Sequence, residues 1–156
     1  MRKIQSLRVQ FLRVHFFLAI PLALSFVACG PASGNISGTI TAPVAVIVNN
    51  SIVIAIPCSS SCTQLGSTAA NAAAAADGTY TLLNVPAGQY VVAAGQDNNG
   101  NGKIDHIGAY GGPNASAVQP PASGINIAMQ PITESASLTT ASAPAALLEA
   151  IRKILK

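Results

Sequence analysis

Short apolar stretches separated by turn-forming residues fill the chain from residue 35 to residue 131. Residues 36–40 (ISGTI) alternate apolar with small or polar side chains, as a strand buried on one face does. Residues 44–48 and 52–56 are β-branched runs on either side of the turn-forming residues 49–51. These two runs predict strands that are either buried on both faces or paired as a hairpin.

The second half of this region continues in the same way. Residues 79–85 and 89–94 flank Pro86-Ala87-Gly88, a turn whose glycine can adopt a positive φ. Residues 125–129 alternate, with their apolar side chains on one face. The Ala-rich tract 69–76 is too short to hold a helix alone, and we interpret it as a crossing between strands. The predicted fold class is therefore all-β, an antiparallel β-sandwich of about seven strands.

A basic segment followed by an apolar run opens the chain. Four Lys and Arg residues lie within the first 13 positions, and residues 15–28 are apolar except for His15, Pro21 and Ser25. This order is that of a secretory signal peptide, which we assign to residues 1–28. The apolar run is shorter than the roughly 20 residues that a membrane-spanning helix requires. The expected location is the cell envelope.

The end of this segment, Phe26-Val27-Ala28-Cys29, resembles the lipobox of bacterial lipoproteins. The resemblance implies that Cys29 is the lipidated first residue of the mature protein, followed by an anchor linker over residues 29–34. Gly30, where an Asp would signal retention in the inner membrane, implies attachment to the outer membrane, on its periplasmic or its surface face. Three acyl chains on one Cys are enough for stable anchoring. The alternative is an ordinary signal peptide cleaved near Ala28.

Composition narrows the class of protein further. Half of the residues are hydrophobic, 8% are charged, and the chain contains 13 Gly and 10 Pro. This is too apolar for a disordered chain and too interrupted for a helical bundle. Beyond residue 28, four Lys and Arg stand against five Asp and Glu, a net charge of −1 with His neutral. A basic face for nucleic acid is therefore excluded.

Two cysteines remain if Cys29 is lipidated. Cys58 and Cys62 enclose three Ser residues. In an oxidising compartment this pair is expected to form a disulfide that closes a short polar loop. Free thiols, a metal site and a redox pair are the alternatives, although the spacing is one residue longer than that of C-x-x-C.

Residues 77–93 (DGTYTLLNVPAGQYVVA) resemble the signature hairpin of carboxypeptidase regulatory-like domains, and residues 36–40 are similar to the first strand of that family. The resemblance implies a transthyretin-like (prealbumin-like) β-sandwich over residues 35–131. It also implies an accessory module without catalytic residues. In such a hairpin Tyr80 and Leu82 share one face, and Tyr90 and Val92 pair with them across the turn.

Residues 97–105 (DNNGNGKID) carry the chemistry of a calcium loop. Oxygen-bearing side chains occupy alternate positions, a Gly permits the sharp turn, and the Lys103 carbonyl would supply a further ligand. The segment resembles the D-x-D-x-D-G-x-x-D sites between strands of exported proteins. The predicted Ca²⁺ ligands are Asp97, Asn99, Asn101, Lys103 and Asp105. Two carboxylates predict weak binding, on the order of 0.1 to 1 mM. The alternative is an ion-free hairpin loop, since Asn-Gly pairs favour turns by themselves.

The C-terminal part is divided in two. Residues 132–144 are rich in Ser, Thr, Ala and Pro and predict a flexible linker. Residues 145–156 predict a short amphipathic helix, with Leu147, Leu148 and Ile151 on its apolar stripe and cations in its last turn. Such a helix either packs back on the sandwich or contacts an anionic membrane or a partner groove.

The expected function follows from these segments. We expect a lipid-anchored, calcium-binding protein of the cell envelope that is structural or adhesive and presents a surface to an envelope protein or a glycan. No enzyme is expected, because His106 has no evident nucleophile or third partner. A carbohydrate-binding module is the alternative, but the chain has no Trp, and all four Phe lie in the signal peptide. Only three Tyr remain to stack on a sugar.

Overall fold

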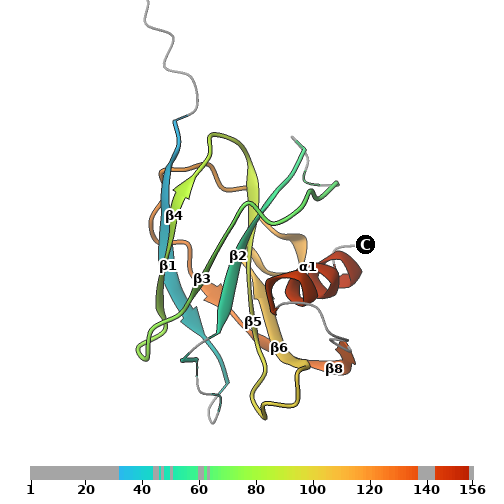
Figure 1. Cartoon of the computed structure of the whole chain (residues 1–156). Coiled ribbons are helices and arrows are strands. Elements are labelled where there is room, and N and C mark those ends of the chain that lie inside the picture. Colours follow the sequence, from blue (N-terminus) through green and yellow to red (C-terminus); the bar gives the residue numbers. More distant parts are fainter. Residues whose placement is uncertain are drawn as a thin grey trace, which may run out of the picture.

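The chain folds as a β-sandwich with one C-terminal helix, as the strand pattern predicted (Figure 1). The computed structural model describes residues 32–43, 46, 48–49, 51–59, 62, 64–136 and 143–154. The signal peptide, Cys29 and most of residues 44–48 lie outside this part. The strands are β1 (Gly34–Thr41), β2 (Ile52–Pro57), β3 (Ala70–Ala73), β4 (Thr79–Val85), β5 (Tyr90–Gln96), β6 (Ile104–Ala109), β7 (Ile127–Ala128) and β8 (Gln130–Ala136), with the 3₁₀ turn η1 (Gly112–Asn114) and the helix α1 (Ala143–Ile154).

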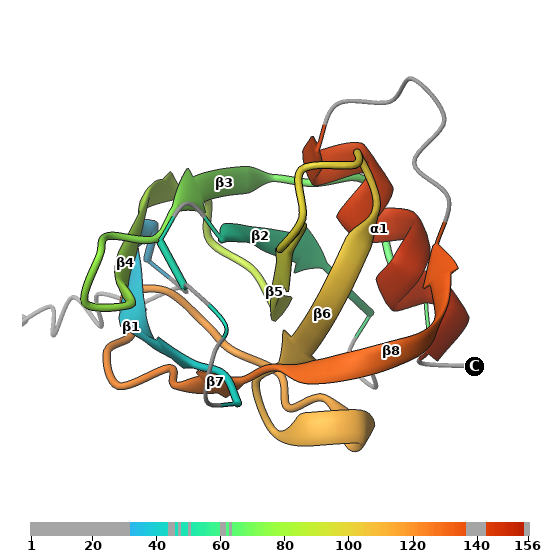
Figure 2. The same ribbon diagram turned by 90° about the horizontal axis from the view of Figure 1, so that it is seen from below.

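The eight strands of the described residues form two sheets. One has the order β4-β1-β7, and the other has the order β3-β2-β5-β6-β8. Neighbouring strands are antiparallel except for β1 and β7, which pair in parallel over two residues each. Figure 2 shows that β7 and β8 follow each other along one side, so the chain passes from the first sheet to the second there.

The facing sides of the two sheets enclose an apolar inner core. Ile36 and Ile40 of β1 point into it, as the alternating sequence of that strand predicted. Tyr80, Leu82 and Val85 of β4 do the same, with two exposed residues between Leu82 and Val85. Ile125, Ile127 and Met129 join from the segment around β7, also as predicted. The largest side chains of the inner core that are less than 2% exposed are Ile36, Leu82, Val85, Val53, Val92, Ile127 and Met129.

The opposite face of the five-stranded sheet carries a second, outer core beneath α1. Ile54 and Ile56 of β2 lie in this core, whereas Val53 and Ala55 point into the inner core. Residues 52–56 are thus buried on both faces, which is one of the two arrangements predicted for this run. The helix packs on the sheet through Leu147, Leu148 and Ile151. Arg152 adds a hydrogen bond from its guanidinium to the Gly66 carbonyl (3.0 Å). The apolar stripe of the helix therefore packs on the sandwich.

Strands β4 and β5 do not form the predicted hairpin. β4 pairs with β1, whereas β5 pairs with β2 and β6 in the other sheet. Asn84, with a φ of 52°, lies at an irregularity within β4, which stays paired with β1 up to Val85. Pro86 follows β4 directly and has no N–H to donate to a ladder, and the chain crosses to the other sheet over residues 86–89. Tyr80 and Tyr90 consequently enter the inner core from different sheets instead of lying side by side in one sheet.

Two other boundaries differ from the prediction. The Ala-rich tract 69–76 contains an edge strand, β3, which pairs with Ile52–Ala55 of β2. β8 extends to Ala136 and so occupies the first part of residues 132–144, predicted as a linker. Both are edge strands, where Pro131 and small side chains are tolerated because only one side must pair.

Gly38 and Tyr80 hold the segment that leads into β7 close to the centre of β1. The backbone of Ile125 passes so close to Gly38 that a Cβ at this position would clash with the Ile125 carbonyl. The Tyr80 hydroxyl, in turn, donates a hydrogen bond to the same carbonyl (2.6 Å). Burial raises the pKa of Tyr80, so this hydroxyl keeps its proton.

Candidate functional site

The predicted calcium loop connects β5 to β6 at one end of the five-stranded sheet (Figure 1). Gly100 and Gly102 adopt left-handed φ angles of 71° and 79°, which side chains with a Cβ rarely adopt. Both glycines face open space. The loop therefore turns sharply twice within a few residues, as the two Asn-Gly pairs favour.

The Asp97 carboxylate lies inside this loop. Its Oδ1 accepts hydrogen bonds from the backbone N–H groups of Gly100 (2.8 Å) and Asn101 (3.2 Å). Its Oδ2 accepts a third from the N–H of Gly102 (2.7 Å). The backbone is thus wrapped around one negative charge, with three N–H groups directed at it.

The other predicted side-chain ligands lie in the same loop. Asn99 Oδ1 accepts the N–H of Asn101 (3.0 Å), and Asn101 Oδ1 accepts the N–H of Lys103 (2.8 Å). Asp105 Oδ2 closes the loop by accepting the N–H of Asn98 (2.9 Å). The structure therefore brings Asp97, Asn99, Asn101 and Asp105 together in one compact turn.

The hydrogen bonds leave acceptor capacity for an ion. A carboxylate offers about four lone pairs and an amide oxygen two. Asp97 uses three of its lone pairs, each Asn oxygen uses one, and Asp105 Oδ1 accepts nothing from the described residues. The same bonds also close the turn without an ion, so both interpretations of the sequence are compatible with this geometry. Within the described residues, no three His, Cys, Asp or Glu side chains form a metal site.

The base of the loop is fixed by Ile104, which the sequence predicted as its anchor in the core, and by a polar pair that the sequence did not identify. Ser51 is fully buried, and its hydroxyl lies 2.6 Å from Gln96 Oε1. The Gln96 amide in turn donates to the Asp97 carbonyl (3.1 Å). Ile104, on the other side of the loop, is 2% exposed in the outer core. Ser51 is 45 residues away from Gln96, so no local pattern could have revealed this pair.

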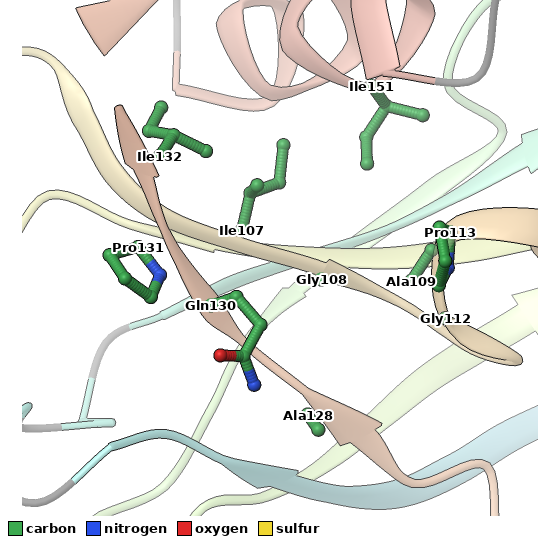
Figure 3. Close-up of a pocket in the computed structure, with 10 residues that line it drawn as sticks. All are labelled: Ile107, Gly108, Ala109, Gly112, Pro113, Ala128, Gln130, Pro131, Ile132 and Ile151. Atoms are coloured by element: carbon green, nitrogen blue, oxygen red, sulfur yellow. The ribbon is translucent and has the colours of Figure 1, made fainter. Parts of the chain in front are cut away.

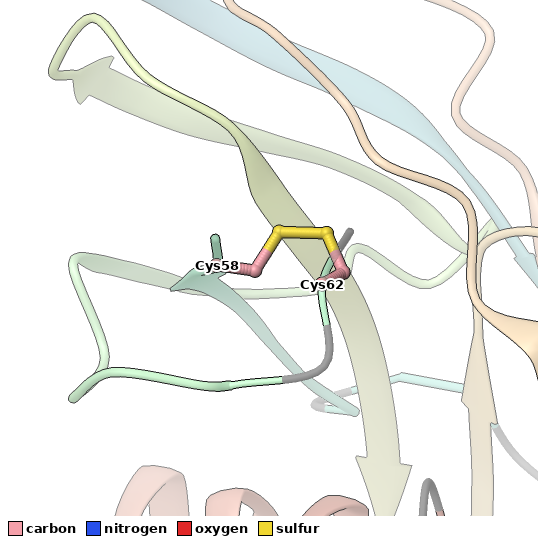
Figure 4. The surroundings of a disulfide bond; sticks show 2 residues. All are labelled: Cys58 and Cys62. Carbon is pink, nitrogen blue, oxygen red and sulfur yellow. A yellow bond between two sulfur atoms is a disulfide. The ribbon is translucent and has the colours of Figure 1, made fainter. Parts of the chain in front are cut away.

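Cys58 and Cys62 form the predicted disulfide directly after β2 (Figure 4). The Cys58 N–H donates to the Gln89 carbonyl (2.9 Å), which ties the disulfide to the start of β5. The Gly66 N–H donates to the Pro57 carbonyl (2.8 Å), and the Gly66 carbonyl accepts the bond from Arg152 described above. The disulfide thus belongs to a segment that joins β2, β5 and α1.

His106 and Asp77, the other two polar residues of interest, lie within a strand and in a turn. His106 lies in β6 and not in a surface loop, opposite Gln96 and Pro131, with its Nδ1 buried and unpaired among the described residues. Asp77 caps the turn before β4, accepting the N–H (2.9 Å) and the hydroxyl (2.7 Å) of Thr79. The Thr79 hydroxyl, followed by its N–H, lowers the pKa of the Asp77 carboxyl.

The aromatic rings that a sugar would need are turned inward. Tyr80 and Tyr90 are 4% and 3% exposed, and the Tyr90 hydroxyl donates to the Pro86 carbonyl (3.0 Å). Tyr110 is partly buried against the inner core. The three rings are therefore engaged in packing, which disfavours the carbohydrate-binding alternative.

In the part of the chain that the structure describes, no helix is long and apolar enough to cross a membrane. Comparison with models of protein families and with curated proteins finds no match to the sequence.

Proposed function

We propose that this chain is a lipid-anchored protein of the cell envelope whose β-sandwich binds Ca²⁺ through residues 97–105. The module is non-catalytic, with a structural or adhesive role, and presents its surface to an envelope protein. The transthyretin-like family resemblance of residues 77–93 and the lipobox at Cys29 are parts of the same proposal.

The loop geometry is the observation that carries this proposal. Four oxygen-bearing side chains lie in one turn between β5 and β6, where each accepts a backbone N–H of the turn, and three of these N–H groups are directed at the Asp97 carboxylate. Calcium favours six to eight oxygen ligands in a flexible arrangement, which carboxylates, amides, a carbonyl and water can provide. Lys103 offsets one of the two negative charges, so the loop has a net charge of −1, which suits weak binding.

The arrangement of the two ends fits an anchored protein. The chain enters the sandwich at Gly34, at one end of β1, and the loop between β5 and β6 lies at the opposite end of the molecule (Figure 1). A tether attached at Cys29 would therefore leave the loop at the end that faces away from the membrane. Such a position suits a site that meets calcium and a partner outside the lipid surface.

Calcium should stabilise the protein against heat. With a dissociation constant of about 0.1 to 1 mM, 10 mM Ca²⁺ contributes roughly 1.4 to 2.7 kcal/mol, a rise of about 5 to 10 °C in Tm. Unfolding of the mature chain, residues 29–156 with Cys29→Ser, is followed by circular dichroism in EDTA, then in Ca²⁺ or Mg²⁺. We expect the rise with Ca²⁺ and a smaller one with Mg²⁺.

Asp105→Asn is the informative variant for this test. The Asn oxygen still accepts the Asn98 N–H, but one of the two carboxylates is lost. We expect an unchanged Tm in EDTA and loss of the calcium shift. Asp97→Ala is less suitable, because it also removes the acceptor of three backbone N–H groups. Equal Tm values for the unsubstituted chain in EDTA and in 10 mM Ca²⁺ would contradict calcium binding and would show that the loop is an ion-free turn.

Lipidation should depend on Cys29 alone. Cells that express the full chain are labelled with an alkyne analogue of palmitate, and the label on the protein is measured after extraction of free lipid. We expect labelling of the unsubstituted chain and of a Cys58→Ser/Cys62→Ser control, and none of Cys29→Ser. A labelled Cys29→Ser chain, or an unlabelled native chain, would contradict the anchor and leave the ordinary signal peptide.

A further inference from the structure

An apolar pocket of about 320 Å³ lies beside α1, on the outer face of the five-stranded sheet (Figure 3). Ile107 of β6 and Ile151 of α1 form its floor, and both are buried. Figure 3 shows the side chains of Ile107, Ile132 and Ile151 gathered beneath the helix. Pro113 of η1 and Pro131 of β8 stand at its rim and are exposed. The pocket is therefore open to solvent at one side and closed by packed elements at the other.

The described residues that line the pocket include no charged side chain. Gln130 is the only one with a polar side chain, and it is exposed at the rim. None of the described lining residues would supply a counter-charge to a carboxylate or phosphate bound there, whereas hydrocarbon would contact their apolar groups. The lining therefore fits an uncharged ligand with a large apolar part.

The volume sets the size of that apolar part. A group of the size of a water molecule or a methylene occupies roughly 30 Å³ in a liquid. The cavity of about 320 Å³ thus accommodates about ten such groups. This matches the lower end of the volumes found for ligand pockets in proteins.

The walls of the pocket are held in place by the fold. Leu147 and Ile151 fix α1 on the sheet, and the Arg152 contact with Gly66 adds a second attachment. On the opposite side, Gly111 and Gly112 adopt left-handed φ angles of 83° and 74°, and these two residues turn the chain into η1. A ligand would therefore enter a space that already exists, without reordering of the chain.

We propose that this pocket binds a single aliphatic chain of about eight to ten carbons that carries an uncharged head group, such as an alcohol or an ester. The hydrocarbon contacts Ile107, Ile132 and Ile151, and the head group lies at the rim near the Gln130 amide. This site is separate from residues 97–105 and depends on neither calcium binding nor the lipid anchor.

The test uses the mature chain, residues 29–156 with Cys29→Ser, labelled with ¹³C at its isoleucine methyl groups. 1-Octanol is titrated, and methyl spectra are recorded. We expect saturable shifts for Ile107, Ile132 and Ile151, and none for Ile36 and Ile40 of the inner core. Octanoate, with the same chain and a charged head, should bind several-fold more weakly.

A variant that fills the pocket, compared with a matched control, tests whether octanol binds in the pocket. Ala109→Leu places a larger side chain in the pocket and should weaken octanol binding at least tenfold. Thr81→Leu adds a comparable side chain on the exposed face of β4, in the other sheet, and should leave binding unchanged. Circular dichroism of both variants shows that they are folded. If Ala109→Leu is unfolded, Gln130→Glu replaces it: a carboxylate at the rim should weaken the binding of octanoate further and leave that of 1-octanol largely unchanged, whereas an equal effect on both ligands would place the head group elsewhere.

Three outcomes would overturn the proposal. Shifts spread evenly over all isoleucine methyls would indicate general solvent effects. Linear, non-saturating shifts at the three pocket residues would show that no binding occurs in this range. A dimer by sedimentation velocity, lost in Ala109→Leu, would show that a second copy of the chain covers the pocket instead.

Discussion

Replacing Gly38 with valine should abolish the cooperative thermal unfolding of the protein. A Cβ at this position meets the carbonyl carbon and oxygen of Ile125, which are backbone atoms and cannot rotate away. The segment around Ile125 would have to separate from β1, which breaks the bond from the Tyr80 hydroxyl and the bond from the Ile125 N–H to the Ser37 carbonyl. Overpacking alone costs about 1 to 3 kcal/mol, and each buried polar group left unpaired costs about 1 to 3 more.

Circular dichroism at increasing temperature measures this effect. A loss of about 4 kcal/mol is a large share of the total stability of a small domain, so we expect a flat or strongly broadened transition. Ser37→Ala is the matched control, because it changes the neighbouring residue of the same strand and leaves its backbone bonds intact. A Gly38→Val protein that melts within a few degrees of the control would show that β1 and the Ile125 segment are not in such close contact.

The second large effect concerns the contact between α1 and β5. A Cβ on Gly95 would lie 2.6 Å from Leu147 Cδ1, so this glycine makes room for the helix on β5. Gly95→Ala should therefore lower stability by about 1 to 3 kcal/mol, through displacement of the helix. Leu147→Ala should cost about 2 to 5 kcal/mol, because Leu147 is fully buried and its removal leaves a cavity.

The double variant distinguishes a direct contact between Gly95 and Leu147 from two independent losses of stability. Once Leu147 is shortened, the methyl group of Gly95→Ala fills part of the space, so the two changes together should cost less than the sum of the two. We expect a coupling free energy of about 1 to 3 kcal/mol in urea unfolding. Strictly additive effects would mean that Gly95 and Leu147 do not touch, and would place α1 elsewhere on the sheet.

The sequence predicted the strands better than their partners. Alternation placed Ile36 and Ile40 in the core correctly, because the period of two is a local property of the chain. The pairing of β4 and β5 was wrong, because a Pro-Ala-Gly turn is compatible with a hairpin and with a crossing between sheets. The pairing is decided by strands far away in the sequence, because β4 pairs with β1 up to Val85 and β5 pairs with β2 and β6. The edge strand β3 was missed because alanines on both faces hide the alternation.

The candidate sites show the same difference between local features, which the sequence reveals, and nonlocal contacts, which it does not. Residues 97–105 are contiguous, so their side-chain oxygens converge whenever the chain turns, and the loop was identified without a fold. The Ser51–Gln96 contact and the pocket beside α1 combine residues from distant segments. In the sequence, nothing connects Ile107, Ile132 and Ile151 with one another, and only the packing of the helix shows that they line one space. Nonlocal sites of this kind require the tertiary structure.

The position of β1 has a mechanical consequence for an anchored protein. A chain held at Cys29 receives any pulling force through Gly34, the first residue of β1. β1 is the central strand of its sheet and is hydrogen-bonded to β4 on one side and to β7 on the other. Because these bonds run across the strand, a force along its axis loads many of them in shear at once instead of opening them one after another. The strand next to the tether is therefore the one best placed to resist extraction.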